Sequence, residues 1–236
     1  MNIALIIAGG SGQRMNQDIP KQFINVYDKP VIIYTLEAFE KHPEIDEIAV
    51  VCIEGWEHLL RAYGKQFGIS KLKHVIPGGK TGMDSIKNGI FYLADIIQEN
   101  PIVLIHDSIR PLVSQEIISD SLVKTKTYGC AVTCIPCVEA MLETKDGISS
   151  ESSYPRDNLK RTQTPQAFFL DDLVTLHKEA QEKGIENSVA TCTLMIELGR
   201  TVYFSMGSEK NIKLTTMDDI DIFKALLKQY QNERKI

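Results

Sequence analysis

The sequence predicts an α/β fold, in which a doubly wound and mostly parallel sheet of the Rossmann-like kind carries helices on both faces. Short apolar runs alternate with amphipathic segments over roughly the first 135 residues, which is the pattern of repeated strand–helix–strand units with right-handed crossovers. The chain has 236 residues, of which 43% are hydrophobic, so one large core can form. No internal repeat or linker divides residues 1–236, and a single domain is expected.

The predicted strands are short apolar runs, as strands buried on both faces are. They lie at 2–8, 47–53, 72–76, 101–107, 130–136 and 201–206. The predicted helices are segments in which apolar residues recur at helical spacing. They lie at 30–42, 56–68, 85–98, 114–129 and 171–183, and a last helix begins at Thr216.

Residues at the predicted helix ends support these boundaries. Pro30 stands at the start of a helix, where a backbone N–H is expendable, and Ser114 is a suitable N-cap. Gly68 closes the second helix, because glycine readily adopts the left-handed conformation of a helix end. Thr216 and Asp219 have the spacing of a capping box, which places the start of the last helix.

Residues 137–160 interrupt the alternation of strands and helices. They contain a Lys145-Asp146-Gly147 turn between two segments without helical periodicity, which predicts a hairpin arm that projects from the sheet. Such an arm needs something to cover it. We expect a second copy of the chain, so that a homodimer forms through residues 137–160.

Composition limits the partners of the chain. The formal net charge of −5 argues against a nucleic-acid binder or an anionic-membrane binder, so any affinity for phosphate must come from a local arrangement. No stretch approaches the length of a membrane span, about 18 apolar residues, and no membrane association is expected. Five cysteines at scattered positions are compatible with a reducing compartment, and a cytoplasmic location is expected.

Candidate functional residues follow the predicted strands, and ligands of a parallel sheet bind beyond the carboxyl ends of its strands. Glycines there let backbone N–H groups approach an anion, and cationic side chains add positive charge. The residues concerned are Gly9, Gly10, Gly12, Arg14 and Lys21 after the first strand, Gly78 and Gly79 after the third, His106, Asp107 and Arg110 after the fourth, and Asn211 and Lys213 after the last. They predict a phosphate-binding rim.

The first glycine loop fits neither of two common phosphate-binding motifs. No Gly-Lys-Ser/Thr follows at the Walker interval, and the dinucleotide motif lacks its third glycine. Taken alone, the loop is also compatible with a tight strand exit whose charges are solvated. His106, which precedes Asp107, is interpreted as forming an orienting hydrogen bond rather than as a catalytic base.

Six sequence blocks carry a resemblance to a known family. The blocks are AGGSGQRM, PKQF, GGKTGMDSIKNG, HDSIRP, RTQTPQAF and NIKLTTMDD. Their order and approximate spacing resemble those of the CTP-dependent alditol-phosphate cytidylyltransferases. This family includes the methylerythritol 4-phosphate enzyme of isoprenoid synthesis and the ribitol 5-phosphate enzymes of wall and capsule polymers. The resemblance extends from Ile3 to about Leu227, nearly the full chain, and implies a single nucleotidyltransferase domain.

The resemblance implies roles for individual residues. The triphosphate would be wrapped by the glycine loop, here Ala8, Gly9, Gly10 and Gly12. Charge on the α-phosphate would be neutralised by Arg14 and Lys21, and another phosphate contact would come from Lys213. The cytidine would be held by Gly79 and Ser85. Asp107 would bind Mg²⁺, and the phosphate of the acceptor would be contacted by Arg110 and by Arg156, the latter from the arm of the neighbouring subunit.

The chemistry of nucleotidyl transfer agrees with the absence of an evident catalytic triad. The nucleophile is a phosphate oxygen whose second pKa of about 6 leaves it mostly ionised at neutral pH, so no general base is required. Positioned cations and Mg²⁺ can stabilise the charge that develops on the α-phosphate and on the departing pyrophosphate.

Departures from the family pattern bear on the acceptor. Gly82 replaces the usual arginine of the GG-x-x-R block, so one contact to the nucleotide is missing or supplied from elsewhere. The arm has Glu139-Ala140 instead of Asp-Thr, and Val189-Ala190 replaces a Thr/Ser-Asp pair. Because the nucleotide-side blocks are kept better than the acceptor-side ones, ribitol 5-phosphate is favoured over methylerythritol phosphate as the acceptor.

Other functions remain open at this point. A methylerythritol phosphate enzyme is the first alternative, and a sugar-1-phosphate nucleotidyltransferase would share the glycine loop and the cations. A dinucleotide-dependent oxidoreductase would need an acidic ribose ligand, for which Glu54 is available, but its first loop would have another form. A nucleotide-binding protein without catalytic activity is compatible with Gly82 and Ala190.

Overall fold

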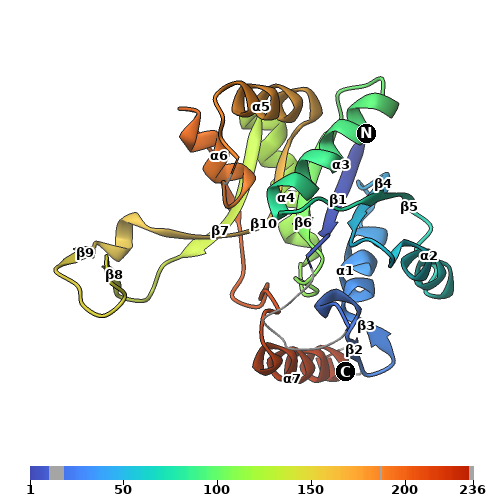
Figure 1. The fold of residues 1–236 in the computed structure, drawn as a ribbon. Coiled ribbons are helices and arrows are strands. Elements are labelled where there is room, and N and C mark those ends of the chain that lie inside the picture. The colour runs from blue at the N-terminus through green and yellow to red at the C-terminus, as the bar shows by residue number, and fades with distance from the viewer. Residues whose placement is uncertain (11–18, 187, 234–236) are drawn as a thin grey trace.

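The computed structural model describes residues 1–10, 19–186 and 188–233. Its centre is a seven-stranded sheet in the order β11-β7-β10-β6-β1-β4-β5 (Figure 1). The strands of this sheet are β1 (Asn2–Ala8), β4 (Glu47–Cys52), β5 (Leu72–Pro77), β6 (Ile102–Asp107), β7 (Cys130–Pro136), β10 (Lys160–Phe169) and β11 (Phe204–Met206). All run parallel except β10, which is antiparallel to both neighbours. The predicted mostly parallel sheet is confirmed.

Helices cover both faces of the sheet. The α-helices of the described residues are α1 (Val31–Glu40), α2 (Glu57–Gln66), α3 (Gly82–Ile96), α4 (Gln115–Tyr128), α5 (Leu170–Glu182), α6 (Thr191–Glu197) and α7 (Met217–Glu233). On one face Ile6 of β1 belongs to the same buried cluster as Leu36 of α1. On the other face Leu5 of β1 belongs to a cluster with Ile90 of α3. Successive residues of a strand point to opposite faces, so β1 contributes to both cores.

A smaller core lies under α7. It includes Val26 of the short ribbon formed by β2 (Asn25–Val26) and β3 (Lys29–Pro30), together with Phe223 of α7. The 3-10 turn η2 (Lys21–Phe23) precedes this ribbon. The turn η2 and this ribbon thus lie close to the C-terminal helix, at the end of the sheet where the parallel strands finish (Figure 1).

Several predicted helix ends are confirmed by their hydrogen bonds. Ser114 Oγ accepts the N–H of Ile117, and Gly68 has a positive φ of 69° after α2. Thr216 Oγ accepts the N–H of Asp219, whose carboxylate accepts the N–H of Thr216. These contacts satisfy backbone groups that a helix end leaves without intrahelical partners.

The structure also corrects three predictions. Helix α3 begins at Gly82 rather than Ser85, because Thr81 and Asp84 form a capping box before it. The predicted strand at 201–206 is shorter, since β11 spans only Phe204–Met206. Strand β10 and helix α6 were not predicted from the sequence pattern. Strand β10 pairs with strands from distant parts of the chain, and α6 has only seven residues.

Residues 137–160 form a projecting arm, as predicted (Figure 1). Two short antiparallel strands, β8 (Met141–Glu143) and β9 (Ser152–Tyr154), are followed by the 3-10 turn η3 (Arg156–Asn158). The turn between the strands is ordered by Asp146, whose Oδ1 accepts the N–H groups of Ile148 and Ser149 at 2.9 and 2.8 Å. These hydrogen bonds hold the pKa of Asp146 well below its usual range.

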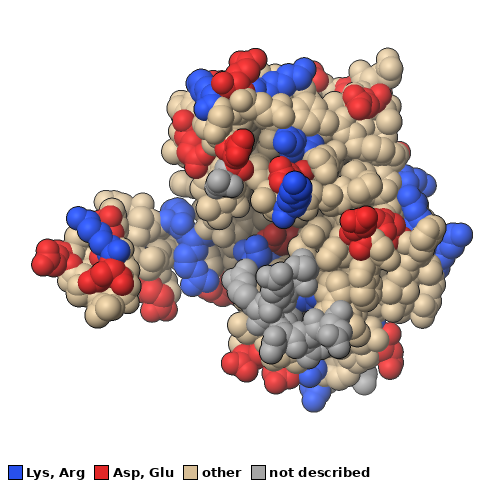
Figure 2. All heavy atoms as spheres, viewed as in Figure 1, with Lys and Arg blue, Asp and Glu red and all other residues tan. Residues whose placement is uncertain are grey.

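The surface carries charges of both signs. Figure 2 shows basic and acidic side chains interspersed on the viewed face, with neither sign covering it. Among the helices of the described residues, none combines the length and apolar content that crossing a membrane requires.

Candidate active site

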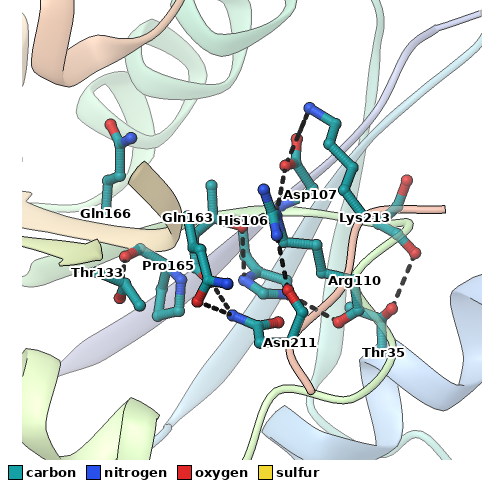
Figure 3. A network of polar contacts seen from close by, with 12 residues as sticks. Thr35, His106, Asp107, Arg110, Thr133, Gln163, Pro165, Gln166, Asn211 and Lys213 are labelled. Carbon is teal, nitrogen blue, oxygen red and sulfur yellow. Dashed lines mark hydrogen bonds and ion pairs between the residues drawn. The ribbon is translucent and has the colours of Figure 1, made fainter. Parts of the chain in front are cut away.

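The carboxylate of Asp107 is the centre of the predicted rim. Asp107 is the last residue of β6, and its Oδ2 lies 3.1 Å from Lys213 Nζ and 3.1 Å from Arg110 Nε (Figure 3). Arg110 Nη1 also donates to the carbonyl of Asn211 at 2.7 Å. Four residues that the sequence placed after two different strands are thus brought together. The cations lie where they can also attract an anionic ligand.

A buried network behind Asp107 holds this rim in place. The Asp107 N–H donates to Thr164 Oγ1 at 3.1 Å, and Thr164 Oγ1 lies 3.0 Å from His106 Nδ1. His106 Nε2 lies 3.1 Å from the Arg110 carbonyl, which can only accept. His106 therefore carries its proton on Nε2, and Thr164 donates to Nδ1. The predicted orienting role of His106 agrees with this arrangement.

The protonation states follow from burial and charge. Burial disfavours ionisation of Asp107, but the positive charges of Lys213 and Arg110 outweigh it and hold the pKa below its usual range. Complete burial lowers the pKa of His106 to about 4. At neutral pH the group formed by Asp107, Arg110, Lys213 and His106 thus contains an ionised carboxylate, two cations and a neutral imidazole. Together these four side chains carry one net positive charge.

Thr164 and Gln163 are functional-site residues that sequence reasoning did not single out. The buried Asn211 donates from Nδ2 to the Thr164 carbonyl at 2.9 Å and to Gln163 Oε1 at 3.3 Å (Figure 3). Gln163 Nε2 in turn donates to the Ser208 carbonyl at 2.8 Å. The only sequence signal for them was the RTQTPQAF block, which contains both residues without indicating their partners.

Two glycine-bearing turns meet beside this rim. A Cβ atom on Gly78 would lie only 3.2 Å from Gly9 Cα, and one on Gly9 would lie 2.5 Å from Ser85 Oγ. Ser85 Oγ also accepts the Gly79 N–H at 3.0 Å and donates to the Thr81 carbonyl at 3.0 Å. These glycines are required by close backbone packing, which joins the end of β1 to the start of α3.

Gly10 differs from its neighbours. A Cβ atom placed on Gly10 would have no heavy atom of the described residues within 4 Å, and its φ is not in the left-handed region. Neither packing nor backbone conformation within the described residues therefore requires glycine at this position. A glycine here is compatible with close approach of a ligand to the backbone.

The other predicted site residues differ in what the structure describes. Gly12 and Arg14 lie outside the described residues. Ala8 ends β1 and is buried, and Lys21 begins η2 and is partly exposed. Arg156 lies on the projecting arm, where its Nη1 donates to the Val138 carbonyl at 3.0 Å.

Most of the positions that depart from the family pattern are open. A Cβ atom at Gly82 would meet no heavy atom of the described residues within 4 Å, so a side chain can begin there without a clash. Ala140 is exposed on the arm, and Val189 is 92% exposed before α6. Ala190, in contrast, is partly buried and packs against the cluster that contains Leu5 and Ile90, so the fold leaves the residue type open at Gly82, Ala140 and Val189 but not at Ala190.

A magnesium ion fits the rim only together with substrate oxygens. Asp107 is ionised and supplies the hard oxygen ligands that Mg²⁺ prefers. Within the part of the chain that the structure describes, no group of three or more acidic, histidine or cysteine side chains is placed to hold a metal. This donor set matches sites in which Mg²⁺ is held by one or two carboxylates and completed by phosphates and water.

The sheet and its rim define a Rossmann-like nucleotidyltransferase. The model of the family described as 2-C-methyl-D-erythritol 4-phosphate cytidylyltransferase matches residues 2–229. The chain therefore belongs to this family and is an enzyme of the cytidylyltransferase class.

Individual relatives support this assignment over the full chain. A ribitol-5-phosphate cytidylyltransferase of Lacticaseibacillus paracasei is 46% identical, across 97% of this chain and 99% of that protein. A 2-C-methyl-D-erythritol 4-phosphate cytidylyltransferase of Clostridium novyi is 35% identical, across 96% of each chain. The crystal structure of 4-diphosphocytidyl-2C-methyl-D-erythritol synthase from Anaerococcus prevotii shares the fold, with a TM-score of 0.82, 24% identity, and coverage of 97% of this chain and 98% of that one.

Proposed function

We propose that the enzyme transfers CMP from CTP to ribitol 5-phosphate, giving CDP-ribitol and pyrophosphate. The observation that carries the choice of acceptor is the difference in identity between full-length relatives. Two relatives named for ribitol 5-phosphate are 46% and 42% identical and others with that name are 35% identical, whereas three clostridial relatives named for methylerythritol phosphate are 33% to 35% identical. The altered residues at Ala140 and Val189 agree with an acceptor other than methylerythritol phosphate.

The reaction requires two polyanions to be brought together. A phosphate oxygen of the acceptor attacks the α-phosphorus of CTP, the bond between that phosphorus and the bridging oxygen breaks, and pyrophosphate leaves with the electron pair. The acceptor phosphate is mostly ionised at neutral pH, so no side chain needs to remove a proton. His106, buried and neutral, is accounted for by its contacts to Thr164 and Arg110.

Cationic side chains provide the stabilisation that this reaction needs. Lys213 is partly exposed beside Asp107, and we assign it to a substrate phosphate. Lys21 and Arg14 are assigned to the α-phosphate, and the turn Ala8–Gly12 to the triphosphate chain. Gly79 and Ser85 are assigned to the cytidine, since they lie beside the same turn. Arg110 is assigned to the acceptor phosphate.

Asp107 would hold Mg²⁺ together with phosphate oxygens. When bound, the ion would neutralise part of the charge on the triphosphate. Asp107 would then exchange some of its contact with Lys213 and Arg110 for the ion, and these two cations would be available to phosphates.

The arm is assigned to a homodimer. Apolar side chains on it are exposed, including Leu142 at 65% and Ile148 at 93%, and a second copy of the chain would cover them. Arg156 would then reach the acceptor phosphate in the neighbouring subunit. We expect the enzyme to act in the cytoplasm, where its substrates would be found.

The acceptor is tested by comparing three phosphates side by side. Pyrophosphate release from CTP is measured with ribitol 5-phosphate, methylerythritol 4-phosphate and glycerol 3-phosphate at equal concentrations. We expect turnover with ribitol 5-phosphate to exceed the other two by at least about tenfold, the equivalent of one good hydrogen bond. Preferential turnover of methylerythritol 4-phosphate would reverse the assignment, and turnover of none would contradict it.

A further inference from the structure

Gln22 makes a contact that none of the assigned roles uses. It lies in η2 next to Lys21 and is only 1% exposed. Its side-chain Nε2 donates to the carbonyl of Ala8 at 2.7 Å and to the carbonyl of Gly10 at 3.0 Å. A glutamine amide has two N–H hydrogens, so one amide group can satisfy both carbonyls. These carbonyls belong to the glycine turn assigned to the triphosphate.

The position of the two carbonyls matters for an anionic ligand. A backbone turn can present either N–H groups or carbonyl oxygens to a ligand, and carbonyl oxygens repel a phosphate. The Gln22 amide is buried, so both carbonyls that it holds point into the protein. The same contact therefore removes two negative partial charges from the side on which a triphosphate would lie.

The direction of one N–H group follows from the sheet. The Ala8 carbonyl also accepts the N–H of Ile53, which follows β4, so this carbonyl lies on the β4 side of β1. In a trans peptide unit the C=O and N–H point in opposite directions. The N–H of Gly9 therefore faces the β6 side, where Asp107 ends its strand. Gln22 and the Ile53 N–H together hold the Ala8 carbonyl and keep this N–H directed at the rim, whereas Gln22 is the donor that holds the Gly10 carbonyl.

Gln22 itself is held firmly. The next residue, Phe23, is 4% exposed and stacks on Trp56 with ring centroids 4.7 Å apart, and its N–H donates to the Pro20 carbonyl at 2.8 Å. The turn that carries Lys21 is thus anchored on one side by packing and on the other by the two carbonyls. One side chain joins the cationic turn to the glycine turn.

We infer that Gln22 is a positioning residue for CTP. It orients the peptide units around Gly9 so that N–H groups face the phosphates, and it fixes the distance between this turn and Lys21. The inference rests on the proposed use of CTP. Its specific consequence is that loss of the amide weakens the binding of CTP while leaving the acceptor site unchanged.

The first test replaces Gln22 by an apolar side chain of similar size. In the variant Gln22→Met the Gly10 carbonyl loses the Gln22 donor and can turn outward, while the Ala8 carbonyl keeps only the N–H of Ile53. We expect the dissociation constant of CTP, measured by calorimetry with Mg²⁺, to rise about tenfold, as for loss of a buried hydrogen bond. The KM of the acceptor should stay within about twofold of the unaltered enzyme, because the rim at Asp107 is not touched.

The matched control is Gln115→Met. Gln115 Nε2 also donates to a backbone carbonyl, that of Ala38, at 2.8 Å, but it lies at the start of α4 and contacts α1. This variant should lose thermal stability to a similar extent and keep the CTP dissociation constant. Equal CTP affinity in Gln22→Met and the unaltered enzyme, with a lowered melting temperature, would reduce Gln22 to a packing role.

A second variant gives a signature that a packing role would not produce. In Gln22→Glu the ionised carboxylate faces two carbonyl oxygens and repels both, whereas the protonated carboxyl regains one O–H donor. CTP binding by this variant, relative to the unaltered enzyme at each pH, should therefore improve as the pH falls from 8 to 6. A constant ratio would overturn the inference. Failure of the unaltered enzyme to bind CTP would overturn the proposed function as well, so the two failures are distinguishable.

Discussion

The rim and the arm differ in how their residues find partners. Asp107 at the rim contacts Lys213 and Arg110, and its backbone is held by Thr164 from another strand. On the arm, Leu142 and Ile148 remain largely exposed, and the hydrogen bonds that Asp146 forms with Ile148 and Ser149 stay within the arm. The fold of one chain therefore builds the rim, whereas the arm presents apolar surface that something outside the chain would cover.

This difference separates chemistry from assembly. Substitutions at the rim should change catalysis or the stability of the whole fold, because their partners belong to several segments of the sheet. Substitutions on the arm should leave the folded subunit intact and change what it assembles with. The following predictions test each side of this contrast.

The largest effect is expected at Lys213. Replacing it in Lys213→Met removes a cation from the rim, and turnover should fall about 100-fold to 1000-fold, the loss seen when one transition-state donor is removed. Pyrophosphate release at saturating CTP and acceptor measures this loss. The side chain is 42% exposed, so folding should be little affected.

The control for this prediction is Lys224→Met. Lys224 is 41% exposed and, like Lys213, is paired with an aspartate, Asp221 of α7, at 2.9 Å. Turnover by this variant should equal that of the unaltered enzyme. Similar losses in both variants would show that the effect of Lys213 is one of general surface charge.

Acid should destabilise the body of the protein. The folded-state pKa of His106 and of His177 lies at about 4, because burial disfavours their charged forms. An unfolded histidine, with a pKa near 6.5, takes up a proton first. The contribution of each neutral, buried histidine to the free energy of unfolding is therefore fully present above about pH 6.5. This contribution, about 3 kcal/mol for each histidine, is lost as the pH falls toward 4.

Denaturant unfolding between pH 7.5 and 4.5 measures this slope. His177 lies in α5, and its Nε2 is buried without a hydrogen-bond partner among the described residues. In the variant His177→Leu the slope should be shallower by the share of one histidine. The arm contains no histidine, so deletion of the arm should leave the part of the slope that comes from histidines unchanged. An unchanged slope in His177→Leu would contradict the prediction.

The sequence pattern was sufficient for elements with local signals. The parallel strands and most helices were predictable because apolar runs, caps and glycines act within a few residues. Strand β10 was not, because it pairs with β6 and β7 across long sequence separations and changes register between Thr162 and Gln166. Helix α6 is positioned by Gln166 of β10, whose Nε2 donates to Cys192 Sγ of α6 and whose Oε1 accepts the Cys192 N–H.

The same distinction applies to the candidate site. Asp107 and Lys213 could be predicted as rim residues because both follow predicted strands. Their direct contact could not, since 106 positions separate them and no local rule sets that distance. The role of Thr164 depends on its hydroxyl lying between Asp107 and His106, which only the assembled sheet determines.

Substitution by alanine should lower the stability of the protein at one of two glycines near the rim and leave it nearly unchanged at the other. In Gly79→Ala the new methyl group would overlap the Cβ of Asp84, so the start of α3 must shift and stability should fall by about 1 to 3 kcal/mol. In Gly10→Ala the new methyl group displaces none of the described residues, and stability should change by less than about 0.5 kcal/mol. Thermal unfolding measures both values.

CTP affinity completes this pair of measurements. If the triphosphate approaches the backbone at Gly10, the methyl group should weaken CTP binding several-fold without loss of stability. Gly10→Ala with unchanged CTP affinity would show that the ligand does not approach this turn closely. A stable Gly79→Ala would contradict the packing argument for the second turn.

The smallest effect on the folded subunit is expected on the arm. Leu142 is 65% exposed, so Leu142→Asp should change the free energy of unfolding by less than about 0.5 kcal/mol. A charge at this position would oppose burial against a second subunit, so sedimentation should show a monomer for this variant and a dimer for the unaltered enzyme. Ile222→Asp on α7, at a residue 50% exposed, is the control and should stay dimeric.

Because Arg156 would no longer reach a neighbouring site, the monomer should also lose affinity for the acceptor while its CTP affinity is kept. A Leu142→Asp variant that remains dimeric would assign the assembly to another surface and leave the arm without its expected partner.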